Sequence, residues 1–136
     1  MLWNLDEVYK ALDIKKRINE NFLFNEISID SRTINKKALF IPIKGKNFDG
    51  HKFIDKVAKI GVKACLIEKR KKHLIKNKKI FLIEVNNTLD SLKKLALYAK
   101  NRIRGLKTIC VTGSNGKTTL KEWLKETLEN NFVVYS

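Results

Sequence analysis

The chain has 136 residues, enough for one compact domain or for one small domain and part of another. Its hydrophobic fraction of 43% is ordinary for a globular protein, no apolar run approaches bilayer length, and Asp6 and Glu7 interrupt the apolar core that an export signal needs. These features argue against a membrane-spanning or exported protein and favour the cytoplasm, whereas the formal net charge of +15 keeps nucleic-acid binding open as an alternative.

The first third of the chain predicts one helix and two strands. Residues 4–12 carry apolar side chains at helical spacing, and Asn4 with Glu7 has the capping-box pattern that starts a helix. The alternating segment 26–30 ("EISID") is typical of a half-buried strand. The continuous apolar run 38–43 ("ALFIPI") predicts a more deeply buried strand, and Pro42 indicates the end or edge of that strand.

The middle of the chain predicts a turn, a helix and two further strands. Residues 45–50 ("GKNFDG") read as a turn, and residues 51–61 have one apolar helical face with Gly61 placed to end the helix. The apolar runs 62–68 and 80–85 predict strands on either side of a basic segment.

That basic segment, residues 68–79 ("EKRKKHLIKNKK"), holds the highest density of cations in the chain. It lies between two predicted strands and has no aromatic side chain that could stack on a base. We therefore expect an exposed basic loop, with His73 solvated. The alternative is a nucleic-acid-binding module that uses Lys69 to Lys79.

Residues 87–103 give the strongest helical pattern. Leucine, alanine and isoleucine side chains form one stripe, and Asn87 with Asp90 can cap the start. Strands that alternate with helices predict a small α/β domain, which we expect to cover residues 1–105.

The last segment, 106–136, predicts the start of a second domain. Residues 107–113 ("KTICVTG") suggest a strand that leads into a glycine loop, and residues 132–136 ("FVVYS") suggest another strand. Strand, loop, helix and strand form the opening βαβ unit of a nucleotide-binding fold, so we expect this domain to be truncated here. The helix between them is expected to pack through Leu120, Trp123, Leu124 and Leu128, with Trp123 a core residue.

The loop itself has phosphate-binding chemistry. Glycines let backbone N–H groups turn toward phosphate oxygens, and the following helix directs its positive dipole end to the same place. Lys117 can reach the terminal phosphates, and the Thr118 hydroxyl can ligate Mg²⁺. Val111 stands where the strict G-x-x-x-x-G-K-[ST] pattern has its first glycine, and a merely structural turn is the alternative. The residues predicted to bind nucleotide phosphates are Gly113, Ser114, Asn115, Gly116, Lys117, Thr118 and Thr119.

Two further polar groups follow predicted strands. Parallel α/β sheets bind ligands at the carboxyl ends of their strands, so these groups are candidate ligand contacts. The alternative assigns Ser31 to a turn and Asp49 to a helix cap. The side chains concerned are Ser31, Arg32 and Thr33 after the first strand, and Asn47, Asp49 and His51 after the second.

The two cysteines, Cys65 and Cys110, lie in apolar runs of strand character. Free thiols in such runs are usually small buried hydrophobic groups, so we expect neither a disulfide nor a metal site.

These motifs together resemble the Mur ligase family. The matching stretches are "DSRTINKKALFIPIKGKNFDGHKFIDKVAKIGVKACLIE", "VNNTLDSLKKLALYAKNRIRG" and "ICVTGSNGKTTLKEWL". The resemblance implies ATP-dependent addition of amino acids to a UDP-linked peptidoglycan precursor through an acyl phosphate. Lys121-Glu122 and the Thr-Gly-Ser start of the loop are most similar to the member that joins D-alanyl-D-alanine to UDP-N-acetylmuramoyl-tripeptide. The member that adds the third amino acid is the alternative.

The resemblance also implies roles for individual residues. It assigns Lys117, the candidate catalytic residue, to the ATP phosphates and Thr118 to Mg²⁺. Family members continue for several hundred residues, with further Mg²⁺ ligands and the D-alanyl-D-alanine site beyond this chain, so we expect the chain alone to be inactive. The residues implied to contact the UDP-N-acetylmuramoyl-peptide are Ser31, Arg32, Asn47, Asp49 and His51.

Overall fold

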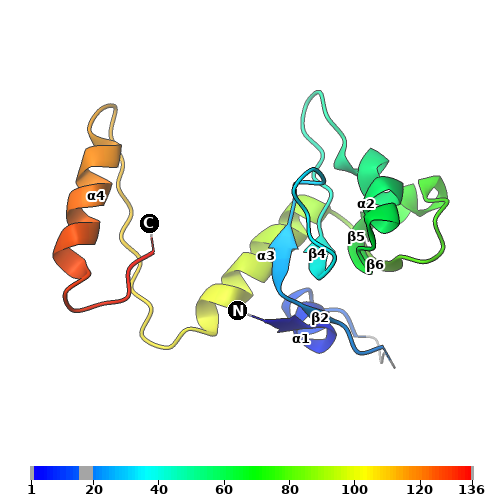
Figure 1. Cartoon of the computed structure of the whole chain (residues 1–136), viewed down its shortest axis with the longest axis horizontal. Coiled ribbons are helices and arrows are strands. Elements are labelled where there is room, and N and C mark those ends of the chain that lie inside the picture. The colour runs from blue at the N-terminus through cyan, green and yellow to red at the C-terminus, as the bar shows by residue number, and fades with distance from the viewer. Residues whose placement is uncertain (1, 16–19, 136) are drawn as a thin grey trace. The chain divides into compact units, whose positions relative to one another are not determined.

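The structure, a computed structural model, describes residues 2–15 and 20–135. The chain divides into two compact units, Met1–Ile103 and Arg104–Ser136 (Figure 1). Each unit is described by itself below.

The N-terminal unit is built on a four-stranded parallel sheet with the strand order β3-β4-β5-β6. All five residues of β5 are buried, which explains the continuous apolar sequence of this central strand. The strands are β3 (Glu26–Ser28), β4 (Ala38–Phe40), β5 (Ala64–Glu68) and β6 (Phe81–Val85).

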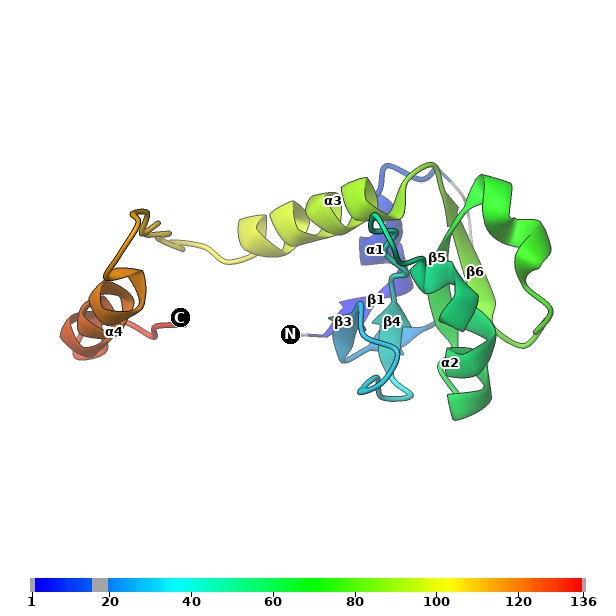
Figure 2. The ribbon, with the colours of Figure 1, turned by 90° about the horizontal axis from the view of Figure 1, so that it is seen from above.

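Helices cover both faces of this sheet (Figure 2). α1 (Leu5–Ala11) and α3 (Thr88–Asn101) pack on one face, and α2 (Ile54–Ile60) packs on the other. Successive residues of β5 alternate between the two cores: Ala64 and Leu66 face α1 and α3, whereas Cys65 and Ile67 face α2. The predicted α/β fold is therefore confirmed for this unit.

The predicted helix ends are also present. Asn4 and Glu7 form a reciprocal capping box, with Glu7 N to Asn4 Oδ1 at 2.8 Å and Asn4 N to Glu7 Oε2 at 2.9 Å. Asn87 Oδ1 accepts from the Asp90 amide at 3.0 Å. Gly61 ends α2 with φ of 105°, a left-handed conformation that only glycine adopts without strain.

Two details of this unit differ from the sequence prediction. The strand expected over 38–43 ends at Phe40, because Pro42 has no N–H to continue the ladder. A short antiparallel pair, β1 (Trp3–Asn4) and β2 (Leu23–Phe24), was not predicted, since two residues are too few for a periodic pattern.

The C-terminal unit contains one helix, α4 (Lys117–Leu128), and no buried side chain among the residues described up to 135. The strands predicted over 107–113 and 132–136 were wrong: the described residues there pair with no strand, because a lone segment has no ladder partner. Trp123, expected in a core, is 62% exposed, and Cys110 is exposed rather than buried.

No helix in the described part of the chain is both long and apolar enough to cross a membrane.

Candidate functional site

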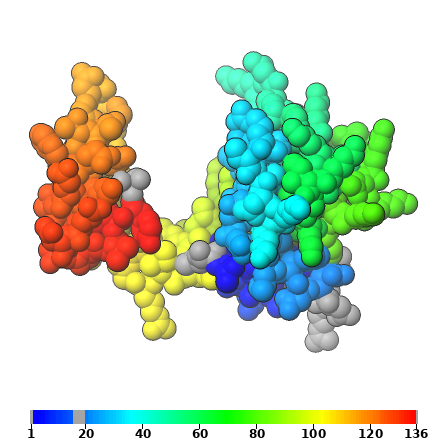
Figure 3. Space-filling model, viewed as in Figure 1, coloured from blue at the N-terminus to red at the C-terminus, as the bar shows by residue number. Residues whose placement is uncertain are grey.

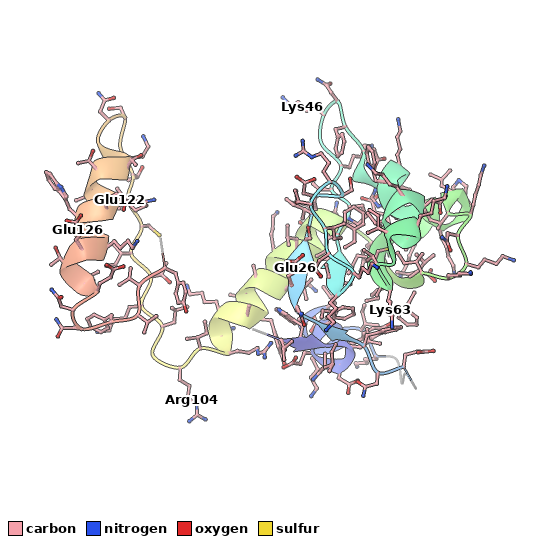
Figure 4. All side chains as sticks on the ribbon, viewed as in Figure 1. Glu26, Lys46, Lys63, Arg104, Glu122 and Glu126 are labelled. Carbon is pink, nitrogen blue, oxygen red and sulfur yellow. The ribbon has the colours of Figure 1, made fainter. Side chains whose placement is uncertain are left out.

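Three chain segments leave the parallel sheet at the same edge. The turn after β3 carries Asp30, Ser31 and Arg32, a projecting turn over residues 44–49 follows β4, and η2 (Lys69–Leu74) follows β5. Figure 4 shows Lys46 in the projecting turn at the end of the sheet away from Lys63, which precedes β5. Because β3, β4 and β5 are neighbours and parallel, the candidate substrate groups share the carboxyl edge of the sheet.

Asp30 and Arg32 form a two-point ion pair in the first of these segments. Arg32 Nε lies 2.9 Å from Asp30 Oδ1, and Arg32 Nη2 lies 2.7 Å from Asp30 Oδ2. The Arg32 hydrogen bonds lower the pKa of Asp30 to about 2. Ser31 is buried within the turn, whereas the Arg32 side chain is 81% exposed, so a ligand can reach the guanidinium.

The 44–49 turn is closed by backbone contacts and presents its tip to solvent (Figure 3, teal). Lys44 and Asp49 form an antiparallel bridge, and the Gly45 amide donates to the Phe48 carbonyl at 2.7 Å. Asn47 is exposed near the tip, and the exposed Phe48 stacks on Phe53 with ring centroids 5.5 Å apart. Asn47 is thus held in a closed turn with its side chain available to a ligand.

Asp49 and His51 are hydrogen-bonded to one another at the base of this turn. Asp49 caps η1 (Gly50–Phe53) by accepting from the His51 amide at 3.1 Å, so the capping role expected for Asp49 is present. The same oxygen lies 2.7 Å from His51 Nδ1, and the Glu68 amide donates to Nε2 at 3.4 Å. These contacts assign the ring proton to Nδ1. His51 is only 3% exposed, so its ring lies within the protein.

Lys71, in the basic segment, completes this cluster. Its Nζ lies 2.8 Å from Asp49 Oδ2 and 3.4 Å from Glu68 Oε2, and its side chain is only 12% exposed. Arg70 also pairs with Glu68 at 2.9 Å. The exposed loop predicted for 68–79 was therefore wrong at this end, where the chain forms the 3-10 helix η2, although His73 is exposed as expected.

Three members of this cluster, Glu68, Arg70 and Lys71, were not predicted from the sequence. Their one local signal is the spacing of Glu68 and Lys71, three residues apart with opposite charge. Nothing in the local sequence indicates the contact with Asp49, which is 22 residues away.

Two acidic groups in the cluster stay ionised. Burial alone would raise the pKa of Asp49, but hydrogen bonds from Lys71 and His51 outweigh it and hold that pKa well below its ordinary value. Burial likewise opposes ionisation of Glu68, and its hydrogen bond from Arg70 and the charge of Lys71 lower its pKa. The cluster therefore contains two carboxylates balanced by two cations.

The glycine loop in the C-terminal unit has the geometry of an anion-binding turn. Gly116 has φ of 75°, and α4 begins immediately after it without a side-chain cap. The Lys117 ammonium folds back and donates to the carbonyls of Gly113 and Ser114, the latter at 3.3 Å. The first-turn amides and the Lys117 charge together fit a phosphate group. Among the residues described, no group of His, Cys, Asp and Glu could hold a metal ion.

The family described as "Mur ligase family, catalytic domain" matches residues 24–100. The chain is 36% identical over 136 residues to the UDP-N-acetylmuramoyl-tripeptide--D-alanyl-D-alanine ligase of Rickettsia prowazekii, covering 100% of this chain and 29% of that protein. It is 37% identical over 128 residues to the UDP-N-acetylmuramoyl-L-alanyl-D-glutamate--2,6-diaminopimelate ligase of Clostridium tetani, covering 88% of this chain and 26% of that protein. The chain thus spans less than a third of the length of these relatives.

Solved structures of such ligases are also similar to this chain. The UDP-N-acetylmuramoylalanyl-D-glutamyl-2,6-diaminopimelate--D-alanyl-D-alanyl ligase of Acinetobacter baumannii matches with a TM-score of 0.83 and 28% identity, over 96% of this chain and 29% of that one. The MurF ligase of Thermotoga maritima, solved in complex with ADP, matches with a TM-score of 0.65 and 35% identity, over 81% and 24%. By sequence and by fold, the chain belongs to the Mur ligase family.

Proposed function

We propose that this chain is part of an ATP-dependent ligase that joins D-alanyl-D-alanine to UDP-N-acetylmuramoyl-tripeptide. In this role the N-terminal unit binds the UDP-linked substrate. The observation that carries the proposal is the gathering of Ser31, Arg32 and Asn47 at the carboxyl edge of one parallel sheet. The similarity of the whole chain to a ligase named for this reaction supports it.

The side chains at this edge suit a nucleoside diphosphate sugar. The exposed Arg32 guanidinium provides a planar, fixed positive charge for a diphosphate oxygen, although it must share or exchange its bond with Asp30. Asn47 offers both a donor and an acceptor for a base or sugar. Asp49 and His51, which we also assign to this site, hold the turn beneath Asn47.

The glycine loop is proposed to bind the phosphates of ATP. The backbone amides of residues 113–119 and the Lys117 ammonium neutralise phosphate charge, and the Thr118 hydroxyl provides one ligand for Mg²⁺. Bound ATP would supply its γ-phosphoryl group to the substrate carboxylate, giving an acyl phosphate and ADP. The incoming amine would then form the amide bond and displace phosphate. We place this activity in the cytoplasm, where ATP is available.

A second candidate is the sibling ligase that adds the third amino acid. The 37% identity to the Clostridium tetani enzyme favours it, although that match covers 88% rather than all of the chain. The two candidates differ in the peptide of the UDP-linked substrate: a tripeptide for the first and a dipeptide for the second. Comparison of the two ligands in one binding experiment distinguishes them.

We expect UDP-N-acetylmuramoyl-tripeptide to bind the N-terminal unit in a ¹⁵N NMR titration. Amide signals of Ser31, Arg32 and Asn47 should shift because these residues face the ligand. Asn47→Ala should weaken binding about tenfold, the order expected for loss of a hydrogen bond to a charged ligand. Asn25→Ala is the matched control, because Asn25 is exposed but precedes β3 at the opposite edge. A titration without shifts at these positions would contradict the proposal.

A further inference from the structure

Lys71 lies in the partly buried cluster beneath the 44–49 turn, and the proposed function assigns no role to this residue. Its segment reads as a solvated basic loop, yet its ammonium group contacts two carboxylates and lies 3.2 Å from His51 Nδ1. We propose that Lys71 is a positioning residue of the UDP-substrate site. It holds Asp49, and through Asp49 the His51 ring and the base of the turn, in the binding arrangement. This inference rests on the proposed function.

The first step is electrostatic. Asp49 and Glu68 both lie within salt-bridge distance of the same Lys71 ammonium, from separate chain segments. Among the described residues, Arg70 pairs with Glu68 and not with Asp49, through Nε at 3.0 Å and Nη2 at 2.9 Å from Glu68 Oε2. Lys71 is therefore the group that joins the two carboxylates. Without it, two like charges would face each other in a partly buried site, where repulsion is strong.

The second step connects Asp49 to the turn. Asp49 is the last residue of the turn, and its backbone pairs with Lys44 at the other end. The following residue, Gly50, packs so closely on Ile43 and Pro42 that the backbone has little room to move. When the contacts of the Asp49 side chain change, the position of the turn that carries Asn47 therefore changes as well.

The third step concerns His51. Its Nδ1 contacts Asp49 and its Nε2 accepts from the Glu68 amide, and its side chain is only 2% exposed. Both ring nitrogens are thus engaged within the protein. His51 therefore orients Asp49 rather than reaching solvent.

The test compares three variants of the full chain. Lys71→Met removes the ammonium and keeps the stem, Lys71→Arg restores a cation that can reach both carboxylates, and Lys72→Met is the control. Lys72 is adjacent and carries the same charge, but it pairs with Glu84 on β6 and its side chain is 56% exposed. Each variant is checked for folding by circular dichroism, titrated with UDP-N-acetylmuramoyl-tripeptide by calorimetry, and observed by ¹⁵N NMR of the histidine rings at neutral pH.

We expect Lys71→Met to weaken binding about tenfold, the loss of one charge-assisted hydrogen bond. The ¹⁵N signals of its His51 ring should shift, because Asp49, which contacts Nδ1, then loses its bond to Lys71. Lys71→Arg should restore both the affinity and the His51 ring signals, and Lys72→Met should change neither.

Three results would each contradict a part of the proposal. A folded Lys71→Met chain that binds as tightly as the unaltered chain would overturn the role of Lys71 in binding. An unchanged His51 spectrum in that variant would overturn its positioning of the ring. If the unaltered chain binds no ligand, the proposed function fails, and with it the role in binding, while the ring spectra still decide the positioning.

Discussion

At the scale of single residues, glycine is required at position 50 because a larger side chain would clash with its neighbours, and not because of the backbone conformation. A Cβ atom at this position would lie 2.9 Å from Ile43 N and 3.1 Å from Pro42 Cα. These are backbone atoms, which cannot move aside as a flexible side chain can. We therefore expect Gly50→Ala to lower the free energy of unfolding by about 1–3 kcal/mol, the usual cost of overpacking.

The control for this prediction is Gly45→Ala, in the 44–49 turn that directly precedes Gly50. A Cβ at Gly45 would meet only the Phe48 carbonyl oxygen at 3.8 Å, an ordinary contact. Urea unfolding followed by circular dichroism should show a change within about 0.5 kcal/mol for Gly45→Ala. Equal midpoints for the two variants would refute the packing argument.

At the scale of secondary-structure elements, α3 (Thr88–Asn101) depends on its N-cap residue, Asn87. Asn87 accepts from the Asp90 amide, and the Ser91 hydroxyl donates to the Asn87 carbonyl at 2.7 Å. Loss of this cap in Asn87→Ala should cost about 1 kcal/mol of unfolding free energy, measured in urea. Asn86→Ala, one residue outside the cap, provides the comparison and should lie close to the unaltered chain. The idea fails if both substitutions cost the same.

Caps and helices were predictable because their signals are local. The capping box of Asn4 and Glu7, the Asn87 cap and the Gly61 terminus each depend on residues a few positions apart. A strand depends on a partner elsewhere in the chain. The β-branched segment 107–113 has strand-like composition, but no described residue pairs with it, so it forms no strand and buries no residue.

The candidate site was predictable to a similar extent. Strand ends could be located from apolar runs, and this placed Ser31, Arg32 and Asn47 at one edge of the sheet. The partly buried position of Lys71 could not be predicted from the sequence, because a charged side chain in a lysine-rich segment is normally solvated. Lys71 reaches Asp49 only through the tertiary fold, because the two residues are 22 positions apart in the sequence.

At the scale of the whole molecule, the two units differ in how they are stabilised. The N-terminal unit has two hydrophobic cores, one on each face of its sheet, whereas the unit Arg104–Ser136 buries no side chain among its described residues. A chain of residues 1–105 should therefore unfold in urea at the same midpoint as the full chain. A lower midpoint for the shorter chain would show that residues 106–136 stabilise the first unit.

The amide of Glu68 gives the site an anchor that only a substitution by proline would remove directly. His51 Nε2 is held by main chain, whose position is fixed by the pairing of β5 with β6. The opposite side of the ring depends on side chains, Asp49 and Lys71, which single nucleotide changes can replace. Descendants of this sequence could therefore adjust the affinity of the site through its charges while inheriting the same ring orientation from the backbone.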